Sequence, residues 1–332
     1  MATPVRIGLI GVGGMARAHI NQLSRIPDVK ITALCDIKPE QLERAKKQFP
    51  DFLTDCFETA DYHELLARED VDAVEIATPH TLHFDQAMDA IKAKKHVLVE
   101  KPMVCTVEHA KTLLGALEGY DKVFALAYQR HAQGTYVYMR EKIASGELGQ
   151  VQFVNALLSQ SWKKGTAGSW RQELALSGGG QLNDSGSHIL DVIMWMTGLT
   201  VADVSAFIDN SGTEVDQNSA LAVKFTNGGQ GVISVLGDTC VGWHEDITIW
   251  CEKGAFFLRN GKLEFCSEKN VRTTIDGETL PPGRSIDEDF IGVIRGEYAA
   301  PAAPPLCGLK TIELTEAAWK SGAQNGQPVK MN

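Results

Sequence analysis

The feature that most constrains the fold is a strand–helix alternation that repeats over roughly the first 125 residues. Val5–Ile10 is an almost continuous apolar run, as expected of a strand buried on both faces. A helical pattern follows it from about Gly14 to Arg25. Later apolar runs of the same kind lie at Lys30–Cys35, Ala73–Ala77, His96–Val99 and Val123–Ala127. Repeated units of this type predict a doubly wound parallel sheet with right-handed crossovers.

The second part of the chain has a different pattern, which begins after about Tyr128. Its β-rich runs are short, and turn-forming pairs such as Asn227-Gly228 and Asn260-Gly261 separate them. This spacing is typical of antiparallel hairpins. One strongly apolar helical segment, Ser187–Thr197, interrupts the strands. The pattern therefore predicts helices together with a large, open, mainly antiparallel sheet.

The length of 332 residues exceeds the usual size of a single hydrophobic core, so two domains are expected. We predict an α/β protein whose first domain spans residues 1–126 and whose second, α+β domain spans residues 127–332. A final helix, about 311–320, could pack back on the first domain.

The composition argues against several classes of protein. A formal net charge of −10 is unfavourable for nucleic-acid binding, which normally needs a basic face. The seven cysteines include no C-x-x-C pair, which fits free thiols in a reducing compartment. Their spacing does not match that of a metal-binding cluster. Met1–Arg6 leads directly into the first apolar run without a signal-peptide pattern, and no uncharged run approaches a membrane span. We therefore expect a cytoplasmic protein.

A glycine-rich turn joins the first strand to the first helix. The segment Gly11-Val12-Gly13-Gly14-Met15-Ala16 has the pattern G-x-G-x-x-A. The first glycine permits a tight turn, the next lets the backbone approach a pyrophosphate, and the alanine allows close helix–strand packing. A dinucleotide would place its phosphates at the helix N-terminus, where N–H groups and the helix dipole favour an anion. The alternative is an ordinary tight turn.

Asp36 lies twenty residues after Ala16, at the end of the second strand. A carboxylate there can bind the adenosine ribose hydroxyls and would repel the 2′-phosphate of NADP. Lys38 is near enough to offset part of that repulsion. The sequence therefore predicts NAD as the cofactor, in preference to NADP.

Two further segments make a family recognisable. The first is Glu100-Lys101-Pro102, and the second is Gly178-Gly179-Gly180 followed by Asp184 and His188. Together with the glycine turn, they resemble the glucose-fructose oxidoreductase / inositol dehydrogenase / rhizopine catabolism (Gfo/Idh/MocA) family over nearly the whole chain. The resemblance implies an NAD-binding Rossmann domain and a second domain for substrate binding and oligomerisation, in a homodimer or homotetramer.

The resemblance also implies positions for the cofactor and substrate. Lys101 is expected between the nicotinamide and the substrate, with a cis Lys101–Pro102 bond and with Glu100 near the nicotinamide. Thr78 and Pro79 are expected to line the cofactor cleft. The chain departs from its relatives at His80, where they often have asparagine, and this residue can contact the cofactor. A second departure is Cys307, where an acidic residue often precedes the glycine.

Lys101, Asp184 and His188 form the predicted catalytic set. Oxidation of a secondary alcohol needs a base, and the imidazole of His188 titrates near physiological pH. Lys101 would bind the reacting oxygen and stabilise its developing charge. Asp184 would hold a neighbouring hydroxyl or orient the base. The alternative is a structural His188–Asp191 pair inside the core, and Asp191 is as readily structural as functional.

Other polar and aromatic residues are candidates for the same cofactor and substrate. His80 and His83 form an H-x-x-H pair, but no third ligand has metal-site spacing, so no metal is expected and His83 is interpreted as starting a helix that lines the cofactor cleft. Indole rings suit the apolar faces of sugars, although buried tryptophans also serve as packing anchors. The predicted substrate residues outside the catalytic set are Tyr128, Arg130, Trp162, Trp170 and Arg171.

The predicted function is hydride transfer between NAD and a secondary hydroxyl or keto group, or an aldehyde, of a sugar or polyol. The main alternative is a redox-neutral glycoside hydrolase or lyase, which would oxidise, eliminate and reduce again with the same residues. A non-catalytic NAD-binding regulator is a further alternative, but such a protein needs no proton-transfer set.

Overall fold

The computed structural model describes residues 4–331. The segment Met1–Arg6, in which the sequence analysis expected no signal-peptide pattern, therefore lies partly outside the described residues. The chain divides into two compact units. The first contains residues up to 104, 108–129 and 284–308, and the second contains residues 105–107, 130–283 and those from 309 onwards. Residues 284–308 therefore return to the first unit late in the sequence. The prediction had a single boundary near residue 126 and placed these residues in the second domain.

The first unit contains a six-stranded sheet in which every neighbouring pair is parallel. The strand order is β3-β2-β1-β4-β5-β6, which confirms the predicted doubly wound topology. The strands are β1 (Val5–Ile10), β2 (Val29–Cys35), β3 (Phe57–Thr59), β4 (Ala73–Ile76), β5 (His96–Val99) and β6 (Phe124–Leu126). The strand order reverses between β1 and β4, and ligands of such sheets bind outside the carboxyl ends of the strands at that point.

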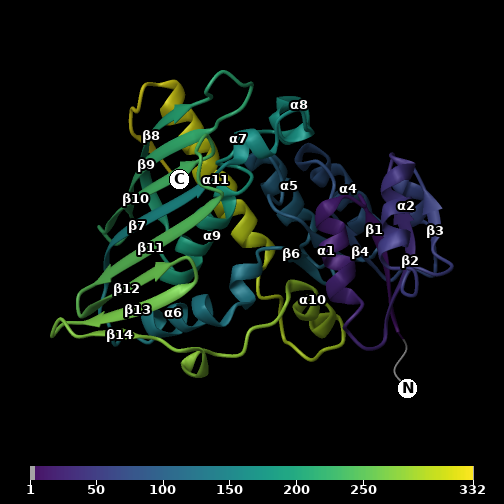
Figure 1. Ribbon diagram of the computed structural model, residues 1–332, viewed down its shortest axis with the longest axis horizontal. Helices are drawn as coiled ribbons and strands as arrows, with labels where there is room; N and C mark the ends of the chain where they lie inside the picture. The colour runs from purple at the N-terminus through teal and green to yellow at the C-terminus, as the bar shows by residue number, and fades with distance from the viewer. Residues whose placement is uncertain (1–3, 332) are drawn as a thin grey trace. The chain divides into compact units, whose positions relative to one another are not determined.

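Helices connect these strands (Figure 1). They are α1 (Gly14–Leu23), α2 (Pro39–Gln48), α3 (Tyr62–Leu66), α4 (His83–Lys92) and α5 (Val107–Ala116). The buried side of α1 presents Ala16, His19, Ile20 and Leu23, a spacing that places them on one helix face. This packing fixes the start of α1 directly after β1.

Helix α10 (Ile286–Ile294) belongs to the first unit although it follows all but one of the strands in sequence. Ser285 and Glu288 form a reciprocal capping box at its N-terminus. Ile286, Phe290 and Ile291 then pack into the core of the first unit. This helix was not predicted, although Ser285 and Glu288 before an apolar run are a local signal of a helix start. The sheet on which its apolar side is buried has no signal in the local sequence.

The second unit contains a nine-stranded sheet of order β14-β13-β12-β11-β7-β10-β9-β8-β15. All neighbouring pairs are antiparallel except β7 and β10, which are parallel, so the sheet is mixed and mainly antiparallel as predicted. Its strands are β7 (Val151–Gln160), β8 (Val201–Asp209), β9 (Asn218–Phe225), β10 (Gln230–Leu236), β11 (Trp243–Cys251), β12 (Gly254–Arg259), β13 (Lys262–Ser267), β14 (Arg272–Thr274) and β15 (Val329–Lys330).

Three helices share the core of the second unit with this sheet: α6 (Gly134–Ala144), α9 (Gly186–Thr197) and α11 (Pro305–Ala323). Two short helices, α7 (Trp162–Gly165) and α8 (Leu174–Ser177), precede α9. Helix α11 begins at Pro305, ahead of the predicted start near residue 311, and its residues from Leu309 onwards belong to the second unit. The alternation along β9, where Leu221 and Val223 are buried and Ala220 and Ala222 are exposed, shows that the helices cover one sheet face.

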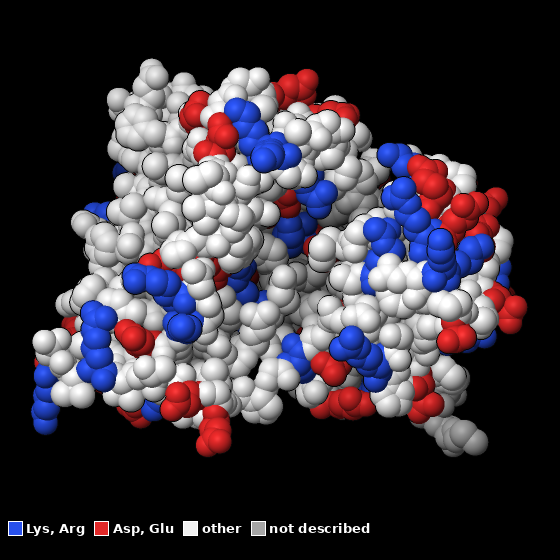
Figure 2. All heavy atoms as spheres, viewed as in Figure 1, with Lys and Arg blue, Asp and Glu red and all other residues white. Residues whose placement is uncertain are grey.

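Charged side chains of both signs are spread over the visible surface. On the face drawn in Figure 2, basic and acidic side chains are interspersed instead of gathering into a single basic area. Among the residues that the structure describes, there is no helix with the length and apolar character needed to cross a membrane.

Candidate active site

The glycine turn after β1 has the conformation that its sequence predicts. Gly11 has a φ of +83°, and a Cβ atom there would lie 2.8 Å from the Ala77 carbonyl oxygen. Only glycine fits such a position without strain. The Asp36 carboxylate then accepts hydrogen bonds from the N–H groups of Val12, at 2.8 Å, and Lys38, at 2.9 Å. The predicted ribose-binding carboxylate is therefore tied to the predicted phosphate-binding turn.

The start of α1 has room for an anion. Gly13 is the N-cap of α1, with no side-chain hydrogen bond to cap the helix. A Cβ atom at Gly13 or Gly14 would meet nothing within 4 Å, and Met15 is exposed. Backbone N–H groups in the first turn of a helix lack intrahelical partners, and the helix dipole favours negative charge there. The residues present therefore fit the pyrophosphate of a dinucleotide.

Thr78, Pro79, His80 and His83 lie together after β4. The Thr78 hydroxyl donates to Gln86 Oε1 at 2.6 Å, and His80 and His83 are both buried. His83 Nε2 lies 3.0 Å from the Thr78 carbonyl oxygen, and Nδ1 lies 2.8 Å from the Pro102 carbonyl oxygen. Burial lowers the pKa of His83, so the neutral ring donates to one of these carbonyls at a time. His83 starts α4, as predicted, and connects the Thr78-Pro79 turn to Pro102.

The Glu100-Lys101-Pro102 segment follows β5. The Lys101–Pro102 bond is cis, as the family resemblance implied. Glu100 is buried, and its Oε2 accepts the N–H of Lys101 at 3.0 Å. Its Oε1 lies 3.0 Å from Nε2 of His19, which the sequence analysis did not single out. A histidine within an otherwise ordinary amphipathic helix gives no local signal of this contact.

In the second unit, the Asp184 side chain contacts two of the predicted substrate residues on the loop that follows β7. Asp184 is buried, and its Oδ2 accepts hydrogen bonds from Trp162 Nε1 at 2.8 Å and Arg171 Nε at 3.0 Å. The Arg171 guanidinium also lies over the Trp170 ring, 4.4 Å from its centroid. The structure therefore brings together four predicted residues that are separated by up to 22 positions in the sequence.

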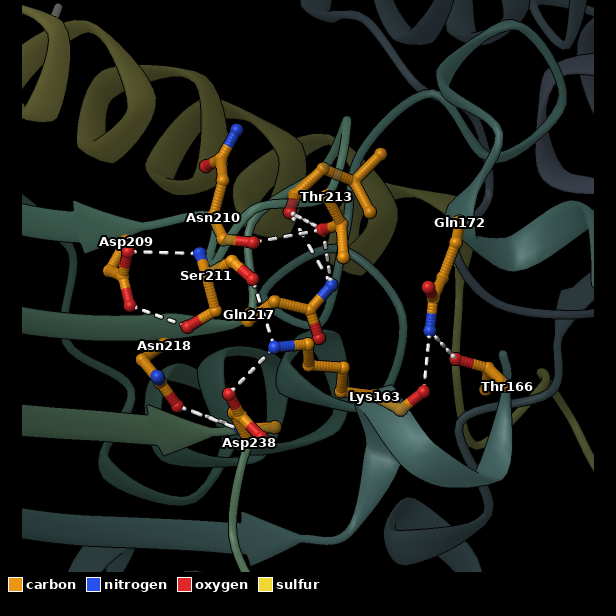
Figure 3. A network of polar contacts seen from close by, with 12 residues as sticks. Lys163, Thr166, Gln172, Asp209, Asn210, Ser211, Thr213, Gln217, Asn218 and Asp238 are labelled. Atoms are coloured by element: carbon orange, nitrogen blue, oxygen red, sulfur yellow. Dashed lines mark hydrogen bonds and ion pairs between the residues drawn. The ribbon is translucent and has the colours of Figure 1, made fainter. Parts of the chain in front are cut away.

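A polar network fixes the other side of this loop (Figure 3). Gln172 Nε2 donates to the Lys163 carbonyl oxygen at 2.7 Å and to the Thr166 hydroxyl at 2.9 Å. Lys163 Nζ donates to the Ser211 carbonyl oxygen and to Asp238 Oδ2, both at 2.9 Å. The loop that carries Trp162 and Arg171 is therefore tied to the strand ends of the nine-stranded sheet.

His188 lies in the first turn of α9 and is largely buried. Asp191, three residues later, has its Oδ2 2.7 Å from Nε2 of His131, and the His131 ring stacks on Trp195 with centroids 4.2 Å apart. All of these groups belong to the second unit. The contact gives Asp191 a structural role with His131 as its partner, where the predicted structural alternative had paired Asp191 with His188.

Arg130 and Tyr128 are less accessible than the sequence suggested. Arg130 is buried in the second unit, pairs with the Glu245 carboxylate and donates from Nε to the Tyr136 hydroxyl at 3.2 Å. Tyr128, in the first unit, is 1% exposed. The Arg130 guanidinium therefore has a structural role in its pair with Glu245. Substrate binding by Arg130 and Tyr128 stays a prediction.

The structure gives a reason for the glycine run that precedes Asp184. The buried Asp216 carboxylate accepts the N–H groups of Gly180 at 2.9 Å and Leu182 at 2.7 Å, as well as Trp319 Nε1 at 3.0 Å. A Cβ atom on Gly180 would lie 1.9 Å from the Asp216 carbonyl oxygen. The glycine run signals such a close approach, but the sequence could not identify Asp216 as the partner.

Comparisons with known families match both parts of the chain. Residues 5–128 match the family described as "Oxidoreductase family, NAD-binding Rossmann fold", and residues 136–257 match the "GFO/IDH/MocA C-terminal domain". The fold is also that of a levoglucosan dehydrogenase solved with NADH and levoglucosan, with a TM-score of 0.87, 20% identity, and coverage of 99% of this chain and 100% of that one.

Three curated relatives represent the activities found among similar sequences. Myo-inositol 2-dehydrogenase of Thermotoga maritima is 25% identical over 262 residues, 77% of this chain and 75% of that protein. Levoglucosan dehydrogenase of Pseudarthrobacter phenanthrenivorans is 27% identical over 206 residues, 58% of this chain and about half (51%) of that protein. A glycosyl hydrolase family 109 protein of a Shewanella species is 41% identical, but over 119 residues, 34% of this chain and 26% of that protein.

The contact between Gly180 and Asp216 gives a test of the site's backbone. Gly180→Ala should destabilise the protein by about 2 kcal/mol or more, because its Cβ has no space and the neighbouring atoms are backbone. Gly115→Ala is the matched control, since that glycine lies in α5 with nothing within 4 Å of the added Cβ, and it should stabilise by about 0.5–1 kcal/mol. Urea denaturation measures both. Equal stability of the two variants would contradict the close approach.

Proposed function

Since the chain belongs to the Gfo/Idh/MocA oxidoreductase family, we propose that it is an NAD-dependent dehydrogenase or reductase acting on a secondary hydroxyl or keto group, or an aldehyde, of a sugar or polyol. The observation that carries the proposal is the open, uncapped start of α1 with the Asp36 carboxylate beside it, which suits a dinucleotide. Relatives named for inositol and levoglucosan oxidation support a polyhydroxylated substrate.

The proposed chemistry assigns one task to each of three residues. The bound nicotinamide supplies an acceptor for the hydride that leaves the substrate carbon. His188 removes the hydroxyl proton, and Lys101 donates a hydrogen bond to the oxygen as it becomes a carbonyl. Asp184 holds a neighbouring substrate hydroxyl. In the reverse direction, His188 returns the proton to the oxygen.

The loop around Asp184 supports this assignment. Two of the hydrogen bonds to its carboxylate come from Trp162 and Arg171, so the acid is held in one orientation. Arg171 retains 30% side-chain exposure, so its remaining N–H groups can reach a ligand hydroxyl. Trp170, stacked against this guanidinium, presents an aromatic surface suited to the apolar face of a sugar.

A second candidate function is a redox-neutral glycoside hydrolase or lyase. The match to the glycosyl hydrolase family 109 protein favours it, although that match covers a third of this chain. Such an enzyme would use the same base and ammonium group but would regenerate its cofactor in every cycle. A non-catalytic regulator is less favoured, because it has no need for Lys101, Asp184 and His188.

We also propose a cytoplasmic location. All seven cysteines of the chain are free thiols in the structure, as a reducing compartment would leave them. Nothing in the acidic composition favours nucleic acid as a partner, so the proposed partners are a small molecule and further copies of this chain.

The chemical assignment is tested by a screen of polyols, aldoses and anhydrosugars with NAD, followed at the NADH absorbance band. Lys101→Met should lower kcat by about a thousandfold, because the developing negative charge loses its hydrogen bond. The affinity for NADH should change by less than about threefold if the lysine acts mainly in the chemical step. Full activity of a Lys101→Ala, His188→Ala double variant would refute the assignment, and cleavage of a nitrophenyl glycoside without net NADH would favour the hydrolase.

Asp36 should set the choice between NAD and NADP. Asp36→Asn retains an oxygen acceptor for the Val12 N–H but removes the negative charge. The ratio of kcat/KM for NADPH to that for NADH should rise at least about tenfold, since hydrogen bonds to charged groups contribute about 1.5–3 kcal/mol. Higher kcat/KM of the unaltered protein with NADPH than with NADH would contradict the NAD preference.

The uncovered sheet face is the proposed surface for a homodimer or homotetramer. Val232 is exposed there, between Ala222 on β9 and Asn155 on β7, and Phe207 and Trp250 are also exposed. Light scattering at micromolar concentration should detect a dimer or tetramer, which Val232→Glu should weaken by burying a charge. Val271→Glu, at an exposed valine outside the sheet strands, is the control. A monomeric unaltered protein would contradict this proposal.

A further inference from the structure

Three carboxyl groups converge on one imidazole inside the first unit. His19 lies on α1, and its neighbours come from three other elements: Glu75 on β4, Glu100 after β5 and Asp287 on α10. All four residues are buried, with exposures between 0% and 7%. We call these four residues the His19 cluster. A buried group of this charge needs protons or counter-ions to be tolerated.

Both ring nitrogens of His19 face a carboxylate oxygen. Nδ1 lies 2.9 Å from Asp287 Oδ1, and Nε2 lies 3.0 Å from Glu100 Oε1. A neutral imidazole has one N–H group, so one of these contacts would set a lone pair against a negative oxygen. An imidazolium donates to both. Burial alone would lower the pKa of His19, but Asp287, Glu100 and Glu75 together raise it well above its usual value.

Whereas the surroundings of His19 favour its charged form, those of Glu75 favour its neutral form. Its two carboxyl oxygens, and Oδ2 of Asp287, have no hydrogen-bond partner among the described residues, and Glu75 Oε2 lies 3.9 Å from His19 Nδ1. Burial and the neighbouring Asp287 carboxylate raise the pKa of Glu75 well above its usual value. If Glu75 retains its proton, Asp287 and Glu100 are the two charged carboxylates that accept hydrogen bonds from the imidazolium. Outside the His19 cluster, the titratable groups that interact electrostatically with Glu100 are Lys101 and the neutral His83.

The Glu100 carboxylate connects the His19 cluster to the backbone of Lys101. One of its oxygens contacts His19, and the other accepts the Lys101 N–H at 3.0 Å. On the far side of Lys101, the Pro102 carbonyl oxygen lies 2.8 Å from His83 Nδ1. The backbone on each side of the lysine is therefore anchored to a buried histidine. His19 is also on the helix whose first turn is the proposed pyrophosphate site.

We propose that His19 is a positioning residue for Lys101, whose imidazolium ring joins the Asp287 and Glu100 carboxylates while Glu75 keeps a proton at neutral pH. The protonation pattern rests on the first unit alone, and the effect on catalysis rests on the proposed function of Lys101. Because the charge of Glu100 is held by His19, loss of the imidazolium would release the Glu100 side chain and the backbone of Lys101.

The sharpest test replaces two carboxyl groups of the cluster by amides. Glu75→Gln substitutes one neutral hydrogen-bonding group for another, so the cluster should keep its charges. Asp287→Asn removes a charged acceptor of His19, so the ring should lose its proton more readily. The same chemical change is thus expected to be mild at one position and harmful at the other.

Histidine NMR on isotope-labelled protein measures the ring directly and needs no substrate. The His19 signal, assigned from its loss in His19→Gln, should report an imidazolium at about pH 8 in the unaltered protein and in Glu75→Gln. In Asp287→Asn, the ring should titrate at a lower pH. A neutral His19 ring at about pH 7 in the unaltered protein would overturn the proposal, whatever the reaction proves to be.

Thermal unfolding gives an independent check on Glu75. A carboxyl group whose pKa is raised on folding takes up a proton, so its stabilising contribution falls as the pH rises. The melting temperature of Glu75→Gln should therefore decrease less steeply than that of the unaltered protein from about pH 6 to about pH 9. A steeper decrease would contradict a protonated Glu75. A stoichiometric divalent ion in elemental analysis, lost in Glu75→Gln, would replace the proton with a metal and also overturn the proposal.

Kinetics then test the link to Lys101. His19→Gln and Asp287→Asn should lower kcat about tenfold or more with KM for the cofactor within about threefold, whereas Glu75→Gln should leave both within about threefold. Asp287→Glu, which restores the charge, should recover part of the lost kcat. An imidazolium seen by NMR together with unchanged kcat in Asp287→Asn would overturn the positioning role while leaving the proposed function intact.

Discussion

The turn between β1 and α1 is the constraint on which the first unit depends. Gly11 can adopt its positive φ and approach Ala77 because it has no Cβ atom. This turn sets the start of α1 beside the carboxyl ends of the parallel strands, where its free N–H groups favour an anion. The same helix carries His19 into contact with Glu100, and so connects the proposed cofactor site with Lys101.

Carboxylates that accept backbone or side-chain N–H groups organise both units. Asp36 fixes the glycine turn, and Glu100 fixes the backbone at Lys101. In the second unit, Asp184 accepts hydrogen bonds from the side chains of Trp162 and Arg171, and Asp216 accepts N–H groups of the glycine run that precedes Asp184. Glu100, Asp184 and Asp216 are buried, and each accepts N–H groups whose burial would otherwise be costly. Part of the acidic excess of this chain therefore shapes its loops from within instead of charging its surface.

The features predicted correctly from the sequence are those with a strong local signal. The alternating apolar runs predicted the parallel sheet, and the glycine pattern predicted the turn at Gly11. Partners brought together by tertiary structure were out of reach: Asp216 behind Gly180, and the parallel pairing of β7 with β10. Helix α10 was missed although Ser285 and Glu288 give a local capping signal, whereas the burial of its apolar side depends on a sheet formed more than 150 residues earlier. Family resemblance supplied what spacing could not, namely the significance of Lys101.

The central claim is that a dinucleotide binds at the glycine turn, and calorimetric titration with NADH tests it without knowledge of the substrate. Gly13 has an ordinary φ of −72°, and a Cβ atom there would contact nothing, so Gly13→Leu should fold normally while its side chain fills the space for the pyrophosphate. The account predicts one NADH per chain for the unaltered protein and at least about tenfold weaker binding for Gly13→Leu. Equal NADH affinity of the two proteins would contradict it.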